Sequence, residues 1–279
     1  MESRFRTDLA CERRGNAHGD DSLLYGCRVS RTVERHKEKK TAYATVRFDK
    51  LSADAERMHQ NPVRAVAELL AQSAARLAPD ARCVLVACLG NPRITPDSLG
   101  PCTARALEVT RHVQLLDPAV FSRFGKGALC AVVPGVLGDT GMEAAELVRG
   151  AAREVGAELV VAVDALAACN PEHLGTTVQI CDRGLRPGAG VGNRRVPVDA
   201  KSVGCPVISL GIPTVIDSGT LICDALLRAG ICGVGEDLEK HLAGVGRYLV
   251  APADIDVTVL RGGALLARAI GACFGLGEA

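Results

Sequence analysis

The sequence has no tryptophan, and aromatic residues make up only 3% of its 279 positions. Proteins that bind single-stranded nucleic acid need aromatic side chains on which bases can stack. The sequence also lacks an excess of one charge, because it has 33 basic and 32 acidic residues and a formal net charge of +1. A chain so close to neutral exerts no long-range attraction on nucleic acid or anionic lipids. We therefore expect neither nucleic acid nor a membrane among its partners.

Export and membrane-spanning signals are missing as well. Residues 1–8 are charged and lack the apolar stretch of a secretory signal peptide. No run approaches the roughly 18 apolar residues that a membrane-spanning helix requires. We therefore expect a cytoplasmic protein whose cysteines stay reduced.

The 12 cysteines lack the spacing of a metal site, since no two of them form a Cys-x-x-Cys pair. Several lie in apolar runs such as residues 83–88, where a thiol acts as a small hydrophobic side chain. A His-Glu-x-x-His motif is also absent, which excludes the zincin class of metalloproteases. The pattern favours cysteine as core filler over cysteine as metal ligand.

Runs typical of β-strands alternate with helical patterns along most of the chain. Strand patterns cover residues 41–48, 84–89, 129–133, 159–163, 177–180 and 206–211, and helical patterns cover 62–76, 101–112, 142–155, 218–227 and 259–274. This alternation predicts a three-layer α/β/α fold with a mostly parallel, twisted sheet. No internal repeat or long low-complexity linker divides the chain, so we expect one α/β domain behind a polar N-terminal extension.

Two aspartates follow strand patterns, where open α/β sheets bind their ligands. Asp164 comes directly after Val-Val-Ala-Val, and a carboxylate there is costly unless it is paired, hydrogen-bonded or protonated. Asp97 lies in the loop after residues 84–89. Thr95 and Pro96 also resemble a helix start, with Thr95 as N-cap and Pro96 at the first helical position. In that case Asp97 would only interact favourably with the positive end of the helix dipole. The pattern leaves open whether Asp97 is catalytic or structural.

Two neighbouring carboxyl groups form a natural acid–base device. Repulsion and burial separate their proton affinities, so one stays ionised while the other holds a proton. The ionised member can activate water and the protonated member can polarise a carbonyl. The loop after residues 129–133 adds candidate substrate-binding residues, whose glycines let backbone approach a peptide closely: Gly135, Gly138, Gly141 and Glu143.

Other catalytic or cofactor motifs fail in context. The glycine-rich stretch at residues 188–193 neither follows a strand nor opens a helix, so it does not indicate dinucleotide binding. A Gly-x-Ser-x-Gly elbow is absent, which argues against an α/β-hydrolase.

Seven motifs occur in the order found in one protease family. They are Gly90-Asn91 and the stretches at residues 95–101, 134–138, 140–143, 163–167, 187–193 and 211–217. Together they resemble the germination protease family of endospore-forming bacteria, over about residues 5–227 and again near 249–252. The resemblance implies an endopeptidase that degrades small acid-soluble spore proteins in the forespore or spore core.

The resemblance carries further expectations. It implies a fold related to hydrogenase-maturation peptidases, Asp97 and Asp164 as the catalytic pair, no metal or other cofactor, and a homo-oligomer such as a tetramer. It also implies a zymogen. Residues 7–12 (Thr-Asp-Leu-Ala-Cys-Glu) match the layout of the family's cleavage site, which predicts residues 1–8 as propeptide, cleavage between Asp8 and Leu9, and a domain at 9–279.

Two features depart from the family pattern. Pro92-Arg93 replaces an aromatic residue after Gly90-Asn91, and residues 229–248 are far shorter than the insertion of larger members. The second departure leaves the oligomeric state and the control of the zymogen open. Two other functions also stay open: a nickel-sensing maturation peptidase like the hydrogenase relatives, and a non-catalytic α/β scaffold that keeps the carboxylates as structural caps.

Overall fold

A single ten-stranded sheet forms the centre of the computed structural model, which describes residues 7–13, 17–18, 21–36, 39–49, 60–124, 127–189, 195–231 and 248–275. Four strands pair in parallel, in the spatial order β6 (Ala128–Val132), β5 (Cys83–Cys88), β7 (Leu159–Ala168) and β9 (Val207–Asp217). The sheet continues antiparallel through β8 (Thr177–Cys181), β4 (Lys39–Arg47) and β3 (Cys27–His36). Three short strands complete it: β1 (Ala17–His18) and β2 (Ser22–Leu24) on β3, and β10 (Leu249–Val250) on β9.

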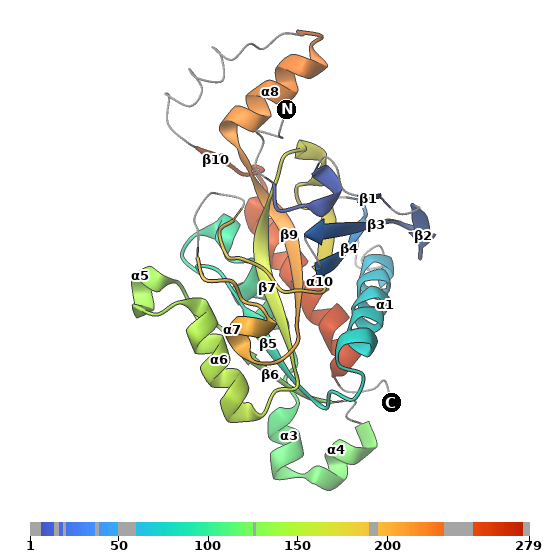
Figure 1. Ribbon diagram of the computed structural model, residues 1–279, viewed down its shortest axis with the longest axis vertical. Coiled ribbons are helices and arrows are strands. Elements are labelled where there is room, and N and C mark those ends of the chain that lie inside the picture. Colours follow the sequence, from blue (N-terminus) through green and yellow to red (C-terminus); the bar gives the residue numbers. More distant parts are fainter. Residues whose placement is uncertain are drawn as a thin grey trace.

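Helices cover both faces of this sheet (Figure 1). One face carries α1 (Gln60–Leu77), α2 (Leu99–Ala106) and α10 (Ile255–Phe274), which share one core cluster with Val84, Val161 and Leu210. The opposite face carries α6 (Ala144–Val155) and α7 (Ala200–Val203), packed on Leu85 and Val160. Each fully buried Val, Leu or Ile contributes about 1.5–3 kcal/mol, so the two clusters fix which side of each strand faces which helices.

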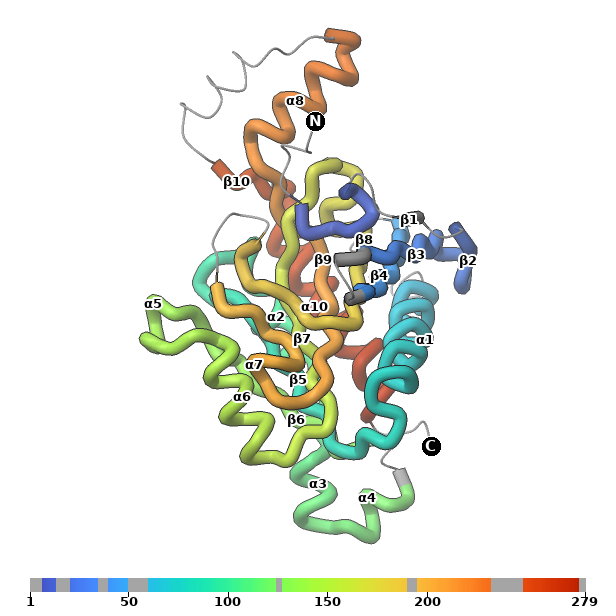
Figure 2. Tube along the Cα trace, viewed as in Figure 1, coloured from blue at the N-terminus to red at the C-terminus, as the bar shows by residue number. Residues whose placement is uncertain are grey.

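The remaining elements are short or peripheral, and the tube trace shows their places (Figure 2). They are η1 (Ala10–Glu12), η2 (Thr95–Asp97), α3 (Arg111–Leu116), α4 (Pro118–Phe124), α5 (Leu137–Thr140), η3 (Pro171–His173) and α8 (Ser218–Arg228).

The predicted three-layer α/β/α class is confirmed, with its parallel strands at the centre, but details differ. The helix expected at 101–112 is two helices, since α2 ends at Ala106 and α3 begins at Arg111. The charged strand β3 was not predicted. Strands β7 and β9 run past the expected ends at 163 and 211, because they keep pairing with each other beyond the end of β5, through a register shift after Leu166.

Helix α10 bears on the expectation that no run is apolar enough to span a membrane. Within the described residues it alone is long and apolar enough by length and composition. Its side chains Val259, Leu266 and Ile270 are nevertheless buried in the core cluster shared with α1 and α2. A core helix of a soluble domain can be equally long and apolar. The packing against α1 and α2 therefore accounts for the hydropathy of α10.

Candidate active site

Asp164 lies where β7 outruns its neighbour. The last residue of β5, Cys88, pairs with Val163, and the next residue of β7 is Asp164, whose other neighbour is Gly211 of β9. Asp164 is therefore inside a strand. The sequence pattern had placed it just after the end of one. Only 6% of it is exposed. Burial raises its pKa well above the usual range, the charges of Asp97 and Asp8 add to this, and the N–H of Ala165, 3.0 Å from Oδ1, acts in the opposite direction.

Asp97 is the last residue of the 3-10 helix η2, which follows β5. The N–H of Asn91 donates to both the Asp97 carbonyl oxygen (3.1 Å) and Oδ2 (2.9 Å). Gly90 has φ +111°, and a Cβ there would lie 2.0 Å from the Asp97 carbonyl oxygen. Burial raises the pKa of Asp97, and the hydrogen bond from Asn91 opposes that rise.

The helix start considered for this loop is present, but its N-cap is one residue earlier than Thr95. Thr95 is itself the first residue of η2, with Ile94 at the N-cap, and α2 begins only at Leu99 after Ser98. Pro96 occupies the second position of a three-residue turn. The reason is local: the two bonds from Asn91 fold the loop back on Asp97, so the chain makes one 3-10 turn before α2 starts. Asp97 therefore lies in the first turn of η2 and directly before Ser98, the N-cap residue of α2.

Both aspartates line one cavity of about 410 Å³. Gly135 and Glu143, two of the predicted substrate-binding residues, also line it, beside Val136 and Leu137. Gly138 and Gly141 are not among the described lining residues. Glu143 has a structural role as well, because it is the N-cap residue of α6 and its N–H donates to Glu146 Oε2 at 2.9 Å.

The N-terminal segment enters the same cavity. Asp8 is a lining residue, its N–H donates to the Ala167 carbonyl oxygen, and its Oδ2 accepts from the Ala167 N–H, both at 2.9 Å. Leu9 is completely buried against Leu166 and Ala168 of β7. The predicted cleavage bond between Asp8 and Leu9 thus lies along β7, and Asp8 lines the same cavity as Asp97 and Asp164.

Two donors that the sequence analysis missed hold the carbonyl group of that bond. Gln179 Nε2 donates to the Asp8 carbonyl oxygen at 2.9 Å, and Arg13 Nη2 donates to it at 3.2 Å. Gln179 and Asp164 are both register partners of Gly211, one on each side of β9. Directly opposed residues point to the same face of a sheet, so both side chains face the N-terminal segment. The available signal was a lone amide in the buried run TVQIC.

Within the described residues, no group of three or more His, Cys, Asp or Glu side chains is arranged to hold a metal ion. Among the described cysteines, Cys27, Cys88, Cys181 and Cys223 are buried. Burial raises the pKa of the Cys88 thiol to about 12, as expected of a core side chain.

Comparison with known proteins identifies the family of the chain. The sequence profile described as germination protease matches residues 18–241. The chain belongs to the germination protease family. The family resemblance drawn from the motifs is thereby confirmed.

Several curated members of the germination protease family align with the chain. The germination protease of Clostridium perfringens is 43% identical over 148 residues, covering 53% of this chain and 45% of that protein. The Clostridium acetobutylicum enzyme is 38% identical over 198 residues (69% and 59%), and that of Halalkalibacterium halodurans 35% over 217 residues (74% and 57%). The chain spans about half the length of the curated relatives it matches.

Two solved structures also align with the chain. A [NiFe] hydrogenase maturation protease from Thermococcus kodakarensis is 15% identical, with a TM-score of 0.36, covering 72% of this chain and 98% of that one. The hydrogenase maturating endopeptidase of E. coli is 14% identical, with a TM-score of 0.29, covering 62% and 99%.

Proposed function

We propose that this chain is an aspartate-dependent endopeptidase that begins the degradation of small acid-soluble spore proteins at germination, in the forespore or spore core. It is made as a zymogen, cuts its own chain between Asp8 and Leu9, and works as a homo-oligomer. The single observation that carries this proposal is the shared cavity, which is lined by Asp97, Asp164 and Asp8, the residue before the expected cleavage bond. Membership of the germination protease family supports the substrate class.

The two carboxyl groups take different roles. Asp164 is deeply buried, and both Asp97 and Asp8 raise its pKa further, so it is the member that keeps its proton. Burial raises the pKa of Asp97 as well, but less than that of Asp164, and the hydrogen bond from Asn91 favours its ionised form, so Asp97 serves as the base. This division follows the rule that two titratable groups whose pKa values are pushed apart act as acid and base.

The reaction proceeds by attack of water on the Asp8 carbonyl carbon. Asp97 removes a proton from the water while Asp164 donates its proton toward the carbonyl oxygen. Gln179 and Arg13 stabilise the charge that develops on that oxygen. As the tetrahedral intermediate collapses, the proton held by Asp97 passes to the nitrogen of Leu9, the carbon–nitrogen bond breaks, and Asp164 recovers its proton.

The test uses two isosteric variants, Asp97→Asn and Asp164→Asn, on a purified small acid-soluble spore protein with and without a chelator. We expect each variant to lose at least about 100-fold in rate, the lower range for removal of an acid–base group. Mass measurement and N-terminal sequencing should show residues 1–8 removed from the wild-type protein only. Asp80→Asn, which changes an exposed aspartate in the turn before β5, is the matched control. Wild-type cleavage rates in either site variant would refute the role of the pair, and inhibition by the chelator would favour a metal-dependent peptidase.

A further inference from the structure

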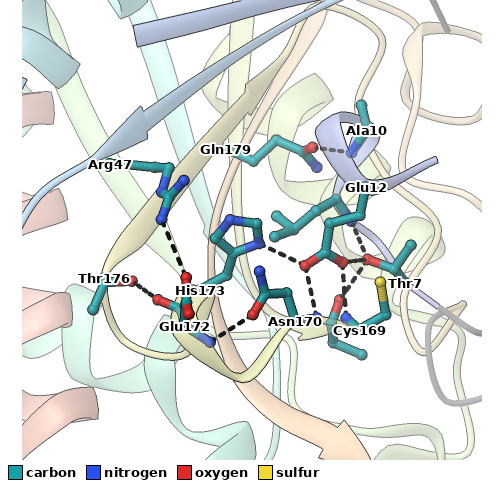
Figure 3. Close-up of polar contacts among 12 residues, drawn as sticks. Thr7, Ala10, Glu12, Arg47, Cys169, Asn170, Glu172, His173, Thr176 and Gln179 are labelled. Atoms are coloured by element: carbon teal, nitrogen blue, oxygen red, sulfur yellow. Dashed lines mark hydrogen bonds and ion pairs between the residues drawn. The ribbon is translucent and has the colours of Figure 1, made fainter. Parts of the chain in front are cut away.

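A buried carboxylate in the N-terminal segment is held by a ring of donors (Figure 3). Glu12 Oε1 lies 2.6 Å from His173 Nδ1 and accepts the Asn170 N–H at 3.0 Å, while Oε2 accepts the Cys169 N–H at 2.8 Å and the Thr7 hydroxyl. The side chains of Glu12 and His173 are only 4% and 9% exposed. Burial by itself acts to raise the pKa of Glu12, but the hydrogen bonds from His173, Thr7 and the two amides outweigh it and lower the pKa.

Three of the four donors belong to the enzyme body and not to the segment. Cys169, Asn170 and His173 lie in the turn that continues β7 into η3. This turn has bonds of its own: the Asn170 side chain accepts the Glu172 N–H at 3.0 Å, and the His173 N–H donates to the Asn170 carbonyl oxygen at 3.1 Å. The three donors, here called the carboxylate pocket, therefore belong to a turn that has hydrogen bonds independent of Glu12.

A continuous path joins the carboxylate pocket to the carboxyl pair. The Asp8 carbonyl group lies at Gln179, Leu9 fills an apolar site formed with Leu166 and Ala168, and the Ala10 N–H donates to Gln179 Oε1 at 2.6 Å. Glu12 then enters the carboxylate pocket. The residues that follow the Asp8–Leu9 bond thus meet defined environments, which is how a peptidase reads the sequence beyond a cleaved bond.

We propose that the carboxylate pocket of Cys169, Asn170 and His173 is the subsite that selects a glutamate at the fourth residue after the cleaved bond of a substrate, with His173 as its specificity-determining side chain. In the uncut chain Glu12 occupies this subsite and keeps substrate out. The inference rests on the proposed peptidase function, because it names the substrate side chain that the same enzyme would recognise.

The alternative is that Glu12 and His173 only anchor the N-terminus. A buried carboxylate is a poor anchor, because the cost of removing its charge from water offsets much of what its partners contribute. The two explanations also predict different effects of two substitutions on peptide binding. If Glu12 competes with substrate, its removal helps a peptide to bind, whereas removal of His173 harms it. If the pair is only an anchor, both changes act in the same direction.

The experiment measures binding of a fluorescent peptide with the sequence of residues 4–14, carrying Ser in place of Cys11, to the full-length Asp164→Asn protein. We expect Glu12→Gln in this background to tighten binding by about 10- to 100-fold, the range for loss of one competing hydrogen-bonded charge. His173→Leu should weaken binding by a similar factor. His173→Gln, which keeps a donor, should restore part of it, and thermal melting checks that each variant is folded. Glu172→Gln, an exposed neighbour that is 57% accessible, is the matched control.

A second peptide with Gln in place of its glutamate isolates the contact. His173→Leu should change the affinity for this peptide little, because the charge it recognises is already gone. The subsite would be overturned if Glu12→Gln and His173→Leu lost affinity for the peptide equally. It would also be overturned if His173→Leu lost as much affinity for the Gln peptide as for the original one. Failure of the function is seen separately: if the peptide binds with the expected signs but the wild-type protein does not cut it, the subsite stands and the peptidase proposal falls. Cleavage at Asp–Leu with no preference for glutamate means the reverse, since the peptidase proposal then stands and the subsite falls.

Discussion

At the scale of the residue, Gly90 determines where the Asp97 carboxyl group lies. Its φ of +111° is outside the range of ordinary side chains, and a Cβ would lie 2.0 Å from the Asp97 carbonyl oxygen. We expect Gly90→Ala to cost about 1–3 kcal/mol of stability through backbone strain and to lower proteolytic activity by more than the stability loss explains. Thermal unfolding and initial rates, measured below the melting temperature, separate these effects.

A second glycine offers the matched control. Gly150 lies inside α6 with open space around it and no positive φ. Gly150→Ala should leave activity unchanged and raise stability by up to about 1 kcal/mol, because alanine favours a helix. If Gly90→Ala were as active as Gly150→Ala, the close approach between Gly90 and Asp97 would have no catalytic importance.

In the proposed reaction Gln179 acts on the reacting carbonyl group, so its replacement should affect the rate of the chemical step. Its Nε2 donates to the Asp8 carbonyl oxygen, but its Oε1 also accepts from Ala10. Gln179→Glu keeps the acceptor and the size while removing the donor. We expect kcat to fall by about 100- to 1,000-fold, as on loss of an oxyanion donor, with a smaller change in KM. A change confined to KM would assign Gln179 to binding alone.

At the scale of the element, the sequence predicted the parallel centre of the sheet because β5, β7 and β9 are buried on both faces and read as continuous apolar runs. It did not predict β3, because charged residues interrupt the apolar pattern around the buried Cys27 and Val29. Asp164 stood out as a charge inside such a run, whereas Gln179 needed the register of β8 on β9 to show its importance. Long-range pairing decides such positions, and local pattern does not contain it.

The docked segment of residues 7–12 should respond to acid. The pKa of Glu12 is lowered in the folded protein, so its contribution is present above the ordinary glutamate range and is lost as pH falls through the folded pKa. The nearby Cys169 thiol, whose pKa burial and Glu12 raise to about 12, stays neutral throughout. We expect the amide protons of Ala10 and Cys169 to lose protection from hydrogen exchange in acid, after correction for intrinsic rates. Glu12→Gln should abolish this pH dependence, and its persistence would exclude Glu12 as the cause.

At the scale of the whole molecule, the extended strands β7 and β9 make the site possible. They continue past β5 and so create a step in the sheet where Asp164 is covered by protein yet borders a cavity. The same step gives the N-terminal segment an edge of β7 to pair with. Asp164, the docked N-terminal segment and the carboxylate pocket thus all depend on one stretch of strand and the turn that follows it.

A carboxyl group buried at this step should reduce the stability of the molecule above acidic pH. The pKa of Asp164 is raised on folding, so the folded state binds more protons than the unfolded state, and stability falls as pH rises above the ordinary aspartate range. We expect Asp164→Asn to abolish activity yet raise the free energy of unfolding at neutral pH. This difference should shrink to near zero below about pH 4, the ordinary aspartate range, where Asp164 is protonated in both states. Urea unfolding at several pH values measures it, and a variant less stable than wild type at neutral pH would mean that the Asp164 carboxylate has stabilising partners that outweigh its burial.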